Sequence, residues 1–116
     1  MNRLIPAVFD DLGVGVVVHN VDSGDILEVN DRFEALYGYT ESELREMSAD
    51  DYSVTAEGFT QTEAERRIRA AAGGEPQTFD WHVERADGHS LCVSVRLARI
   101  ELDGDPYVPA AVRDTT

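Results

Sequence analysis

The sequence predicts a single α+β domain in which a helical middle segment packs on one face of an antiparallel sheet. Three observations indicate this class. Two short apolar runs come first, helix-start signals recur through the middle of the chain, and strict apolar–polar alternation begins at residue 78. With 116 residues, of which 42% are hydrophobic, the chain suits one core and is too apolar for a disordered acidic tail. We therefore expect one domain over residues 1–116.

The N-terminal segment has the apolar spacing of a helix. Its apolar residues recur three and four positions apart, and Pro6 is acceptable within a first helical turn. This pattern predicts an amphipathic helix over residues 3–12, ahead of a core over residues 14–116. A free surface helix does not need so much apolar surface, so we expect the helix to dock on the sheet or on a second subunit. The apolar side consists of Leu4, Ile5, Val8, Phe9 and Leu12.

A β-hairpin and a capped helix follow. The apolar runs at residues 14–19 and 26–29 are separated by a segment rich in Asp, Asn, Ser and Gly, which predicts a hairpin. Asn30 stands where its side chain can accept the first backbone amides of a helix. Gly38 supplies the C-terminal stop of that helix.

Two further helices begin at capping boxes. Thr40 with Glu43 predicts a second short helix, and Thr60 with Glu63 predicts the longest helix of the chain. The long helix should end at Gly73. The middle of the chain is therefore expected to be helical.

Two strands with a period of two follow residue 78. Apolar residues alternate with polar ones over residues 79–83 and again over residues 91–97. A two-residue loop between these strands would put apolar and polar side chains on the same face. A three-residue loop over Ala86, Asp87 and Gly88, with Gly88 left-handed, aligns the apolar positions, and we predict this loop.

The last strand follows a turn at residues 103–105. The apolar phase slips between residues 97 and 100, which predicts a bulge near Ala98 or Arg99. Pro109 lies within this last strand and has no backbone N–H to donate to a neighbouring strand. We therefore expect the strand to be bulged or shortened at Pro109.

The charge of the chain excludes some classes of partner. There are 23 acidic residues against 10 basic ones, all of them Arg, and the net charge is −13. A surface of this sign repels phosphate backbones and anionic lipid headgroups, so nucleic-acid and membrane-surface roles are disfavoured. No apolar run approaches the roughly 20 residues of a membrane span, and the N-terminus lacks a signal-type stretch. We expect a cytoplasmic domain.

Abundant carboxylates without any Lys fit either an ordinary acidic protein or one adapted to high salt. Carboxylates repel one another in dilute buffer, whereas the Debye length is only about 3 Å at 1 M salt. Concentrated salt would relieve this repulsion. We favour a halophilic origin on this ground.

Short motifs along the chain resemble the PAS domain family. No single motif is specific, but their order and spacing match that family from about Val8 to Thr116. The motifs are Asp22-x-Gly24-x-Ile26, Val29-Asn30, Phe33 onward to Gly38-Tyr39, Glu43-Leu44, Asp87-Gly88, Asp103-Gly104 and Arg113-Asp114-Thr115-Thr116. Thr115 departs from the family pattern, which has an aliphatic residue there. The resemblance implies a five-stranded antiparallel sheet in spatial order 2-1-5-4-3, whose inner face and helices enclose a cavity.

The resemblance also implies a role in signalling. PAS domains are sensory and protein-interaction modules, usually attached to histidine kinases, transducers, transcription regulators or cyclic-dinucleotide enzymes. The closing residues 113–116 are similar to the end of the family core, after which a signalling helix normally leads to an output domain of the same polypeptide. We expect a non-enzymatic sensory domain of a histidine kinase or transducer-like regulator, which forms a homodimer through its N-terminal helix. A stand-alone PAS protein and a ligand-free dimerisation scaffold are the alternatives.

In this family, apolar side chains between the sheet and the helices line a ligand cavity. The same pattern is typical of an ordinary filled core, so both interpretations stay open. The residues of this set are Phe33, Tyr37, Tyr52, Ile68, Phe79, Trp81, Leu91, Val93 and Val95. Among them, Tyr37, Tyr52 and Trp81 have polar tips that can orient a small ligand.

The resemblance gives little support to a covalent flavin or to haem. Flavin photosensors of the family have a reactive cysteine in the helical middle, where this chain has none. Haem-binding members have an axial histidine on the long helix, and residues 61–72 contain none. The ligand is therefore unknown, and a non-covalent flavin stays open.

A polar set on the outer sheet face is the remaining candidate for chemistry. The three-residue loop puts His82 opposite Cys92, with Asp80 and Glu84 on the same face. A nucleophilic thiol needs an oxyanion site as well as a base, and a flat strand face offers no free donors. A thiol-dependent enzyme that uses Cys92 and His82 is thus a distant alternative to a solvated polar face. The acidic clusters match no EF-hand loop, so no metal site is expected.

Overall fold

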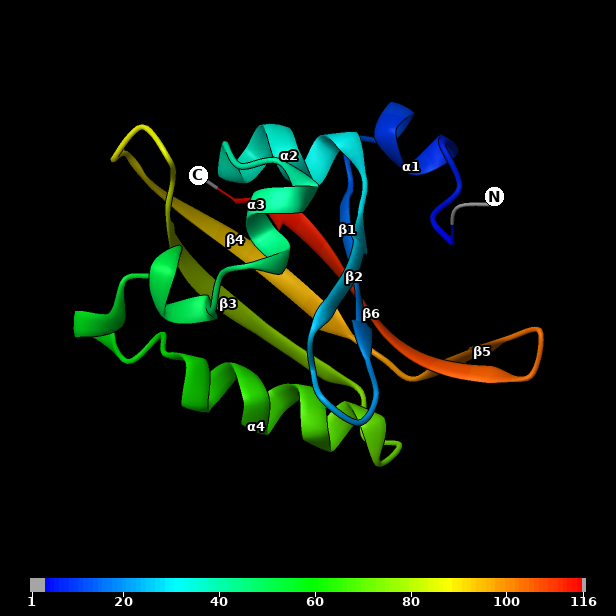
Figure 1. Ribbon diagram of the computed structural model, residues 1–116. Helices are drawn as coiled ribbons and strands as arrows, with labels where there is room; N and C mark the ends of the chain where they lie inside the picture. Colours follow the sequence, from blue (N-terminus) through cyan, green and yellow to red (C-terminus); the bar gives the residue numbers. More distant parts are fainter. Residues whose placement is uncertain (1–3, 116) are drawn as a thin grey trace.

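One antiparallel sheet forms the centre of the protein, and helices cover its inner face (Figure 1). A computed structural model describes residues 4–115. The elements in chain order are α1 (Val8–Asp11), β1 (Gly15–Asn20), β2 (Ile26–Val29), α2 (Asp31–Tyr37), α3 (Glu41–Arg45), the 3-10 helices η1 (Ala49–Asp51) and η2 (Thr55–Glu57), α4 (Gln61–Ala72), β3 (Gln77–Glu84), β4 (Ser90–Leu97), β5 (Ile100–Leu102) and β6 (Asp105–Asp114). None of the described helices is long and apolar enough to cross a membrane. The predicted α+β class is confirmed.

The sheet has the predicted order with one added strand. Its strands lie in the order β2-β1-β6-β4-β3, and β5 pairs with β6. The strand predicted after residue 91 is divided into β4 and β5, because the backbone at Ala98 and Arg99 leaves the ladder. The described residues therefore form six strands, where the sequence predicted five.

Pro109 accounts for this division. The carbonyl of Pro109 accepts the amide of Ala98 at 3.3 Å. In an antiparallel strand the N–H and C=O of one residue face the same neighbour, so the amide that proline lacks also faces this gap. Pairing has the same register on both sides of the gap, with no inserted residue, so the predicted bulge is wrong. β6 continues unbroken from Asp105 to Asp114, and the predicted shortening at Pro109 is wrong as well.

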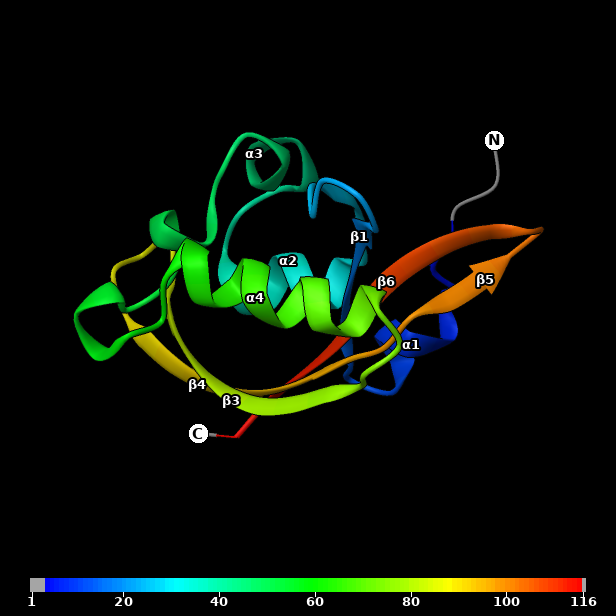
Figure 2. The same cartoon turned by 90° about the horizontal axis from the view of Figure 1, so that it is seen from below.

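The two faces of the sheet bury different parts of the chain. Helices α2, α3 and α4 lie on one side, and α1 lies on the other (Figure 2). On the inner face, Val17 and Val108 belong to the main core. On the outer face, Val16 and Val18 form a second cluster with the N-terminal segment. Strand β1 is therefore apolar on both faces.

The N-terminal helix is shorter than predicted. It covers Val8–Asp11, whereas the prediction was residues 3–12, of which residue 3 lies outside the described range. The amides of Leu4 and Ile5 donate to the carboxylate of Glu28 on β2, at 3.0 and 2.8 Å. Pro6 disfavours helical backbone at the residue before it. The segment ahead of α1 is therefore bound to the sheet in a non-helical form.

The hairpin between β3 and β4 has the predicted three-residue loop. The amide of Arg85 donates to the carbonyl of His89 at 2.8 Å, which closes the loop over residues 86–88. Gly88 has a φ of 87°, the left-handed conformation that the prediction required. His82 lies opposite Cys92, as predicted.

Asn30 caps α2 as predicted and also binds the helix to the sheet. Its Oδ1 accepts the amides of Phe33 at 3.0 Å and of Val16 at 2.8 Å. Its Nδ2 donates to the carbonyl of Val14 at 2.9 Å. One buried side chain thus joins the first strand to the first helix of the inner layer.

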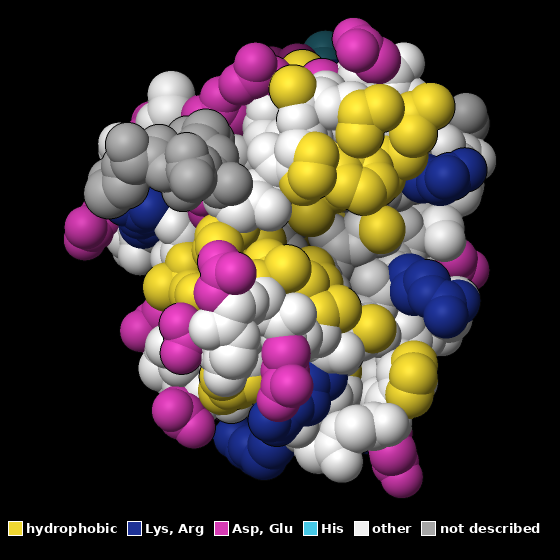
Figure 3. All heavy atoms as spheres, turned by 90° about the vertical axis from the view of Figure 1, so that its right-hand side faces the viewer, with side chains coloured by type: hydrophobic (Ala, Val, Ile, Leu, Met, Phe, Trp, Pro, Cys, Tyr) yellow, Lys and Arg dark blue, Asp and Glu magenta, His cyan; other side chains and the backbone are white. Residues whose placement is uncertain are grey.

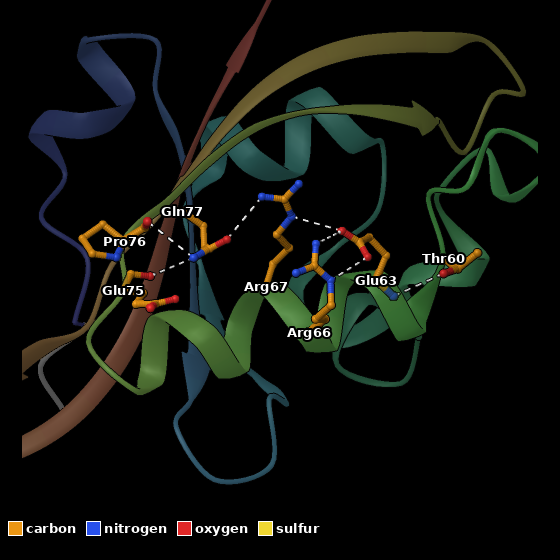
Figure 4. Close-up of polar contacts among 7 residues, drawn as sticks. All are labelled: Thr60, Glu63, Arg66, Arg67, Glu75, Pro76 and Gln77. Carbon is orange, nitrogen blue, oxygen red and sulfur yellow. Dashed lines mark hydrogen bonds and ion pairs between the residues drawn. The ribbon is translucent and has the colours of Figure 1, made fainter.

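The two predicted capping boxes differ in the structure. At α3 both bonds are present between Thr40 and Glu43, as predicted. At α4 the Thr60 hydroxyl accepts the amide of Glu63 at 3.2 Å, but the Glu63 carboxylate binds Arg66 and Arg67 instead of the amide of Thr60 (Figure 4). The second capping box is therefore only half formed, because two guanidinium groups compete for its carboxylate.

Other segments bind the edges of the sheet. Glu41 Oε1 on α3 accepts the amide of Val29 at 2.8 Å, and Arg45 Nη2 donates to the carbonyl of Leu27. At the opposite edge, Ser53 pairs with Val83 of β3. Both edge strands therefore have part of their backbone hydrogen-bonded by side chains or loops.

Candidate functional site

A cavity of about 60 Å³ lies between the inner face of the sheet and helices α2 and α4. Seven of the nine predicted pocket residues line it. They are Phe33, Tyr37, Tyr52, Ile68, Phe79, Trp81 and Val95. The other two, Leu91 and Val93, are buried at the opposite end of the same face of β4, where core side chains cover them. The structure therefore places the hollow at the Val95 end of β4.

The cavity also has lining residues that the sequence reading missed. They are Val17, His19, Ala49, Ala64, Leu97, Ala110 and Val112. Three of these are alanines, from η1, α4 and β6, and their short side chains leave the space that a larger residue would fill. His19 is the polar member of the group.

His19 is a buried, neutral histidine. Its side chain is 7% exposed, and its Nδ1 lies 3.0 Å from the carbonyl of Val108. Because a carbonyl only accepts, Nδ1 carries the hydrogen and Nε2 keeps a lone pair. Burial lowers the pKa of His19 to about 4, against a smaller opposing effect of the Val108 hydrogen bond. His19 therefore supplies an uncharged acceptor to the cavity wall.

Tyr37 and Tyr52 supply two hydroxyl groups. Their rings meet edge to face, with centroids 5.4 Å apart, and Tyr37 also stacks on Phe33 at 4.1 Å. Burial raises the pKa of Tyr52 to about 12 and raises that of Tyr37 further, so both phenols keep their protons. Within residues 4–115, the structure gives no hydrogen-bond partner for either hydroxyl or for the Nε2 of His19, whose ring bonds through Nδ1 alone. All three groups are available to a bound molecule.

Trp81 has a different role from the one predicted. Its Nε1 donates to the hydroxyl of Ser53 at 2.7 Å, so its only polar atom is already bonded. The indole ring packs against Phe79 and Phe59, with centroids 5.7 and 5.1 Å away. Trp81 thus forms an apolar wall of the cavity and leaves the polar contacts to other residues.

A polar network joins α4 to the start of β3 (Figure 4). Arg67 donates from Nε to Glu63 at 3.1 Å and from Nη1 to Gln77 at 3.2 Å. Its guanidinium carbon lies 4.5 Å from the centroid of the Phe79 ring. A hydrogen bond from Arg66, with further help from Arg67, lowers the pKa of Glu63, so this carboxylate stays ionised.

The cavity does not fit flavin or haem. Pockets for ligands of that size have volumes of about 300–1,000 Å³, several times the volume here. No Asp, Glu or Arg is among the described residues that line it. Cys92 is exposed on a strand and is absent from the cavity wall, so it cannot form a covalent bond to a molecule bound there.

On the outer face of the sheet, Cys92 is exposed and lies opposite His82 of β3. His82 Nδ1 lies 2.9 Å from Glu57 Oε2, which occupies one ring nitrogen. The carbonyl of Cys92 accepts both the amide and the hydroxyl of Thr115, at 3.0 and 3.1 Å. Among the described residues, no group of three or more His, Cys, Asp or Glu side chains is placed to hold a metal ion.

The predicted dimer residues divide into two sets. Leu4, Ile5 and Phe9 pack against the outer face of the protein's own sheet. Val8 and Leu12 remain 54% and 66% exposed. Figure 3 shows hydrophobic side chains gathered on the side of the molecule that carries α1 and the β5–β6 hairpin.

Known proteins share this architecture. A family profile described as PAS domain matches residues 13–116. The PAS domain of an HTR-like protein from Haloarcula marismortui has 31% sequence identity and a TM-score of 0.76, with 93% of this chain and 86% of that chain covered. No curated protein sequence matches the chain.

Two more distant structures show the same fold. A domain of a sensory box sensor histidine kinase/response regulator from Geobacter sulfurreducens is 24% identical, with a TM-score of 0.69 and coverage of 93% of this chain and 89% of that chain. A PAS domain from Colwellia psychrerythraea is 21% identical, with a TM-score of 0.72 and coverage of 94% and 92%. At these identities the likeness concerns the fold alone.

Proposed function

Because this chain belongs to the PAS domain family, we propose that it is a sensory module of a signal-transduction protein, such as a histidine kinase or a transducer-like regulator. The molecule sensed is small and neutral, and it binds in the cavity between the sheet and α4. The domain itself is not an enzyme in this proposal.

Three unpaired polar groups in an apolar cavity support this function: the Nε2 of His19 and the hydroxyls of Tyr37 and Tyr52. None of the three is among the described buried side-chain atoms that lack a hydrogen-bond partner, so each reaches the open space of the cavity, where a matching group of a bound molecule can replace water. A charged ligand would lose its hydration without meeting an opposite charge in the described lining. The geometry therefore favours a neutral molecule with an apolar body and a hydroxyl or similar group.

The volume limits the size of this molecule. A cavity of about 150 Å³ binds benzene, whereas one water needs a cavity of only about 10–15 Å³. The cavity of about 60 Å³ thus has room for a molecule of a few non-hydrogen atoms. A short alcohol is a suitable probe.

We predict that 1-propanol binds in the cavity and that Tyr52→Phe weakens its binding about fivefold, the effect of one lost hydrogen bond of about 1 kcal/mol. The fluorescence of Trp81, the single Trp of the chain, reports on binding, and amide shifts map the site. Tyr107→Phe on the outer face is the matched control and should leave the affinity unchanged. No response to 1-propanol, or equal affinity in both variants, would contradict the proposal.

Strand β6 is a direct route from the cavity to an output domain of the same polypeptide. Ala110 and Val112 line the cavity, and the strand ends two residues later at Asp114. A ligand in contact with these two side chains changes the packing of the strand that leads toward the end of the domain. We propose that the signal leaves along β6.

A ligand-free dimerisation scaffold is the second candidate, supported by the exposed apolar residues of α1. We predict that Leu12→Asp converts a homodimer into a monomer, because a carboxylate would be buried in the interface. Light scattering measures the mass, and Ser42→Asp on α3 is the control for added charge. Phe9→Asp is less informative, since Phe9 packs on its own sheet. An unchanged mass in Leu12→Asp would exclude this interface, and native mass spectrometry that finds no bound molecule would favour the scaffold over the sensor.

The composition supports a cytoplasmic setting in a halophilic microbe, as does the likeness to a Haloarcula protein. We predict that the melting temperature rises between 0.1 and 2 M KCl, because salt screens the repulsion among the excess carboxylates. Neutralising three exposed carboxylates with Asp11→Asn, Glu46→Gln and Glu84→Gln should reduce this rise. A melting temperature that stays flat or falls with salt would refute the adaptation.

A further inference from the structure

A second hollow lies next to the cavity, between the β1–β2 turn and α4. Its volume is about 130 Å³, and its lining includes Asp22, Gly24, Glu65 and Arg69. Ile68 lines both this groove and the inner cavity. Figure 1 shows the β1–β2 turn beside the C-terminal half of α4, where the groove lies. The apolar cavity and the polar surface groove thus share one lining side chain.

We infer that Ile68 is the gate of the cavity and sets the length of the ligand that it admits. This inference rests on the proposed function, and it adds the route of entry and the residue that determines specificity. A molecule enters through the groove, and its apolar part passes Ile68. A ligand too long for the cavity would keep its polar end in the groove, near Asp22, Glu65 and Arg69.

The turn side of the groove is fixed by hydrogen bonds. Asn20 Oδ1 accepts the amides of Asp22 at 2.8 Å and of Ser23 at 3.0 Å. The backbone of Asn20 also bonds to Gly24 and Asp25, each at 2.9 Å. Gly24 has no Cβ, and one built there would lie 3.9 Å from Cγ2 of Ile68, so the glycine leaves space for about one carbon atom beside the Ile68 side chain. The turn therefore forms a fixed wall of the groove, and Gly24 leaves space beside Ile68.

The helix side of the groove is packed less tightly. Among the residues of α4, only Ala71 is fully buried, whereas Ile68 is partly exposed. Ile68 packs against the main core on one side and is partly exposed on the other, so a change of rotamer meets close-packed neighbours on one side only. The mobile part of the gate is thus Ile68 itself, carried by a helix that few buried side chains hold.

Chain length provides a direct test. Primary alcohols from ethanol to 1-heptanol are titrated into the protein, with Trp81 fluorescence and amide shifts as readouts. In the wild type we expect the affinity to rise about fourfold for each added methylene until the cavity is full, and then to stop rising. In Ile68→Ala the limit should move to alcohols longer by two or three carbons, and in Ile68→Val by about one. Ile100→Ala, an exchange of the same kind on an exposed strand, should keep the wild-type limit.

The outcomes separate the two proposals. If no alcohol binds to the wild type in the cavity, the proposed function fails. If alcohols bind to the wild type but the Ile68 variants keep the same length limit, the proposed binding function is supported and the role of Ile68 as a gate is refuted. The milder Ile68→Val variant decides the question if Ile68→Ala does not fold.

Discussion

Replacing Asn30 with Ala is expected to lower the free energy of unfolding by about 4 kcal/mol. An ordinary helix N-cap contributes about 1 kcal/mol. Asn30 is 5% exposed, and its removal also leaves the buried amide of Val16 and the buried carbonyl of Val14 without their partner. Each buried group that loses its hydrogen bond adds about 1–3 kcal/mol. The total is a large share of the 5–15 kcal/mol that usually stabilises a domain.

Urea unfolding of three variants tests this result. Thr60→Ala removes an N-cap from α4 and should cost about 1 kcal/mol, since its side chain accepts a single amide. Asn30→Asp keeps the two acceptor contacts and loses the donor to Val14, so its cost should fall between the other two. Equal losses in Asn30→Ala and Thr60→Ala would show that Asn30 is no more than a helix cap.

Lowering the pH from 7 to 4 is expected to remove about 3 kcal/mol of stability through His19 alone. Burial lowers the pKa of His19 from 6.5 to about 4 in the folded protein. Between these values the unfolded chain binds a proton that the folded protein does not, so stability falls as the pH falls. The loss begins as the pH drops below about 6.5 and is nearly complete at about pH 4.

Carboxylates also titrate in this range, and a matched pair of variants isolates the histidine. His19→Gln is neutral at every pH, and its amide can still donate to the carbonyl of Val108. His89→Gln alters a histidine whose side chain is 85% exposed. Urea unfolding gives the free energy of unfolding at pH 7 and at pH 4. The loss between these two pH values should be about 3 kcal/mol smaller in His19→Gln than in the wild type, and unchanged in His89→Gln. If both variants lose as much stability between pH 7 and pH 4 as the wild type does, then His19 does not resist protonation in the folded protein.

The sequence predicted most of the fold because local rules and the sheet agree there. The capped helix at Asn30 and the left-handed Gly88 each follow from backbone geometry within a few residues. The predicted length of the N-terminal helix was wrong because a distant contact overrides the local pattern there. Its first residues bind the carboxylate of Glu28, more than 20 positions away, and no local pattern encodes this contact.

The candidate site was predicted in part, for a similar reason. Phe79 and Trp81 lie on a strand with strict alternation, so their face could be read from the sequence. Strand β1 is apolar on both faces, because the N-terminal segment covers Val16 and Val18, and its alternation is hidden. His19 was therefore not assigned to a face, although it lies two residues after Val17 on the same side. Alanines such as Ala110 leave space because their side chains are small. A small residue predicts a cavity only when the residues that surround it in space are known.

The bonds that α3 makes to β2 limit how the protein can assemble. An edge strand with free amides and carbonyls invites a strand from another molecule, which leads to fibres and swapped sheets. Here Glu41 and Arg45 take up the amide of Val29 and the carbonyl of Leu27, and the segment at Ser53 pairs with part of the other edge. Growth of the sheet by strand addition is therefore opposed at β2 and at β3, where part of the edge backbone is already bonded. If copies of the protein associate as proposed, their contacts are then expected on the faces of the sheet, where Val8 and Leu12 are exposed.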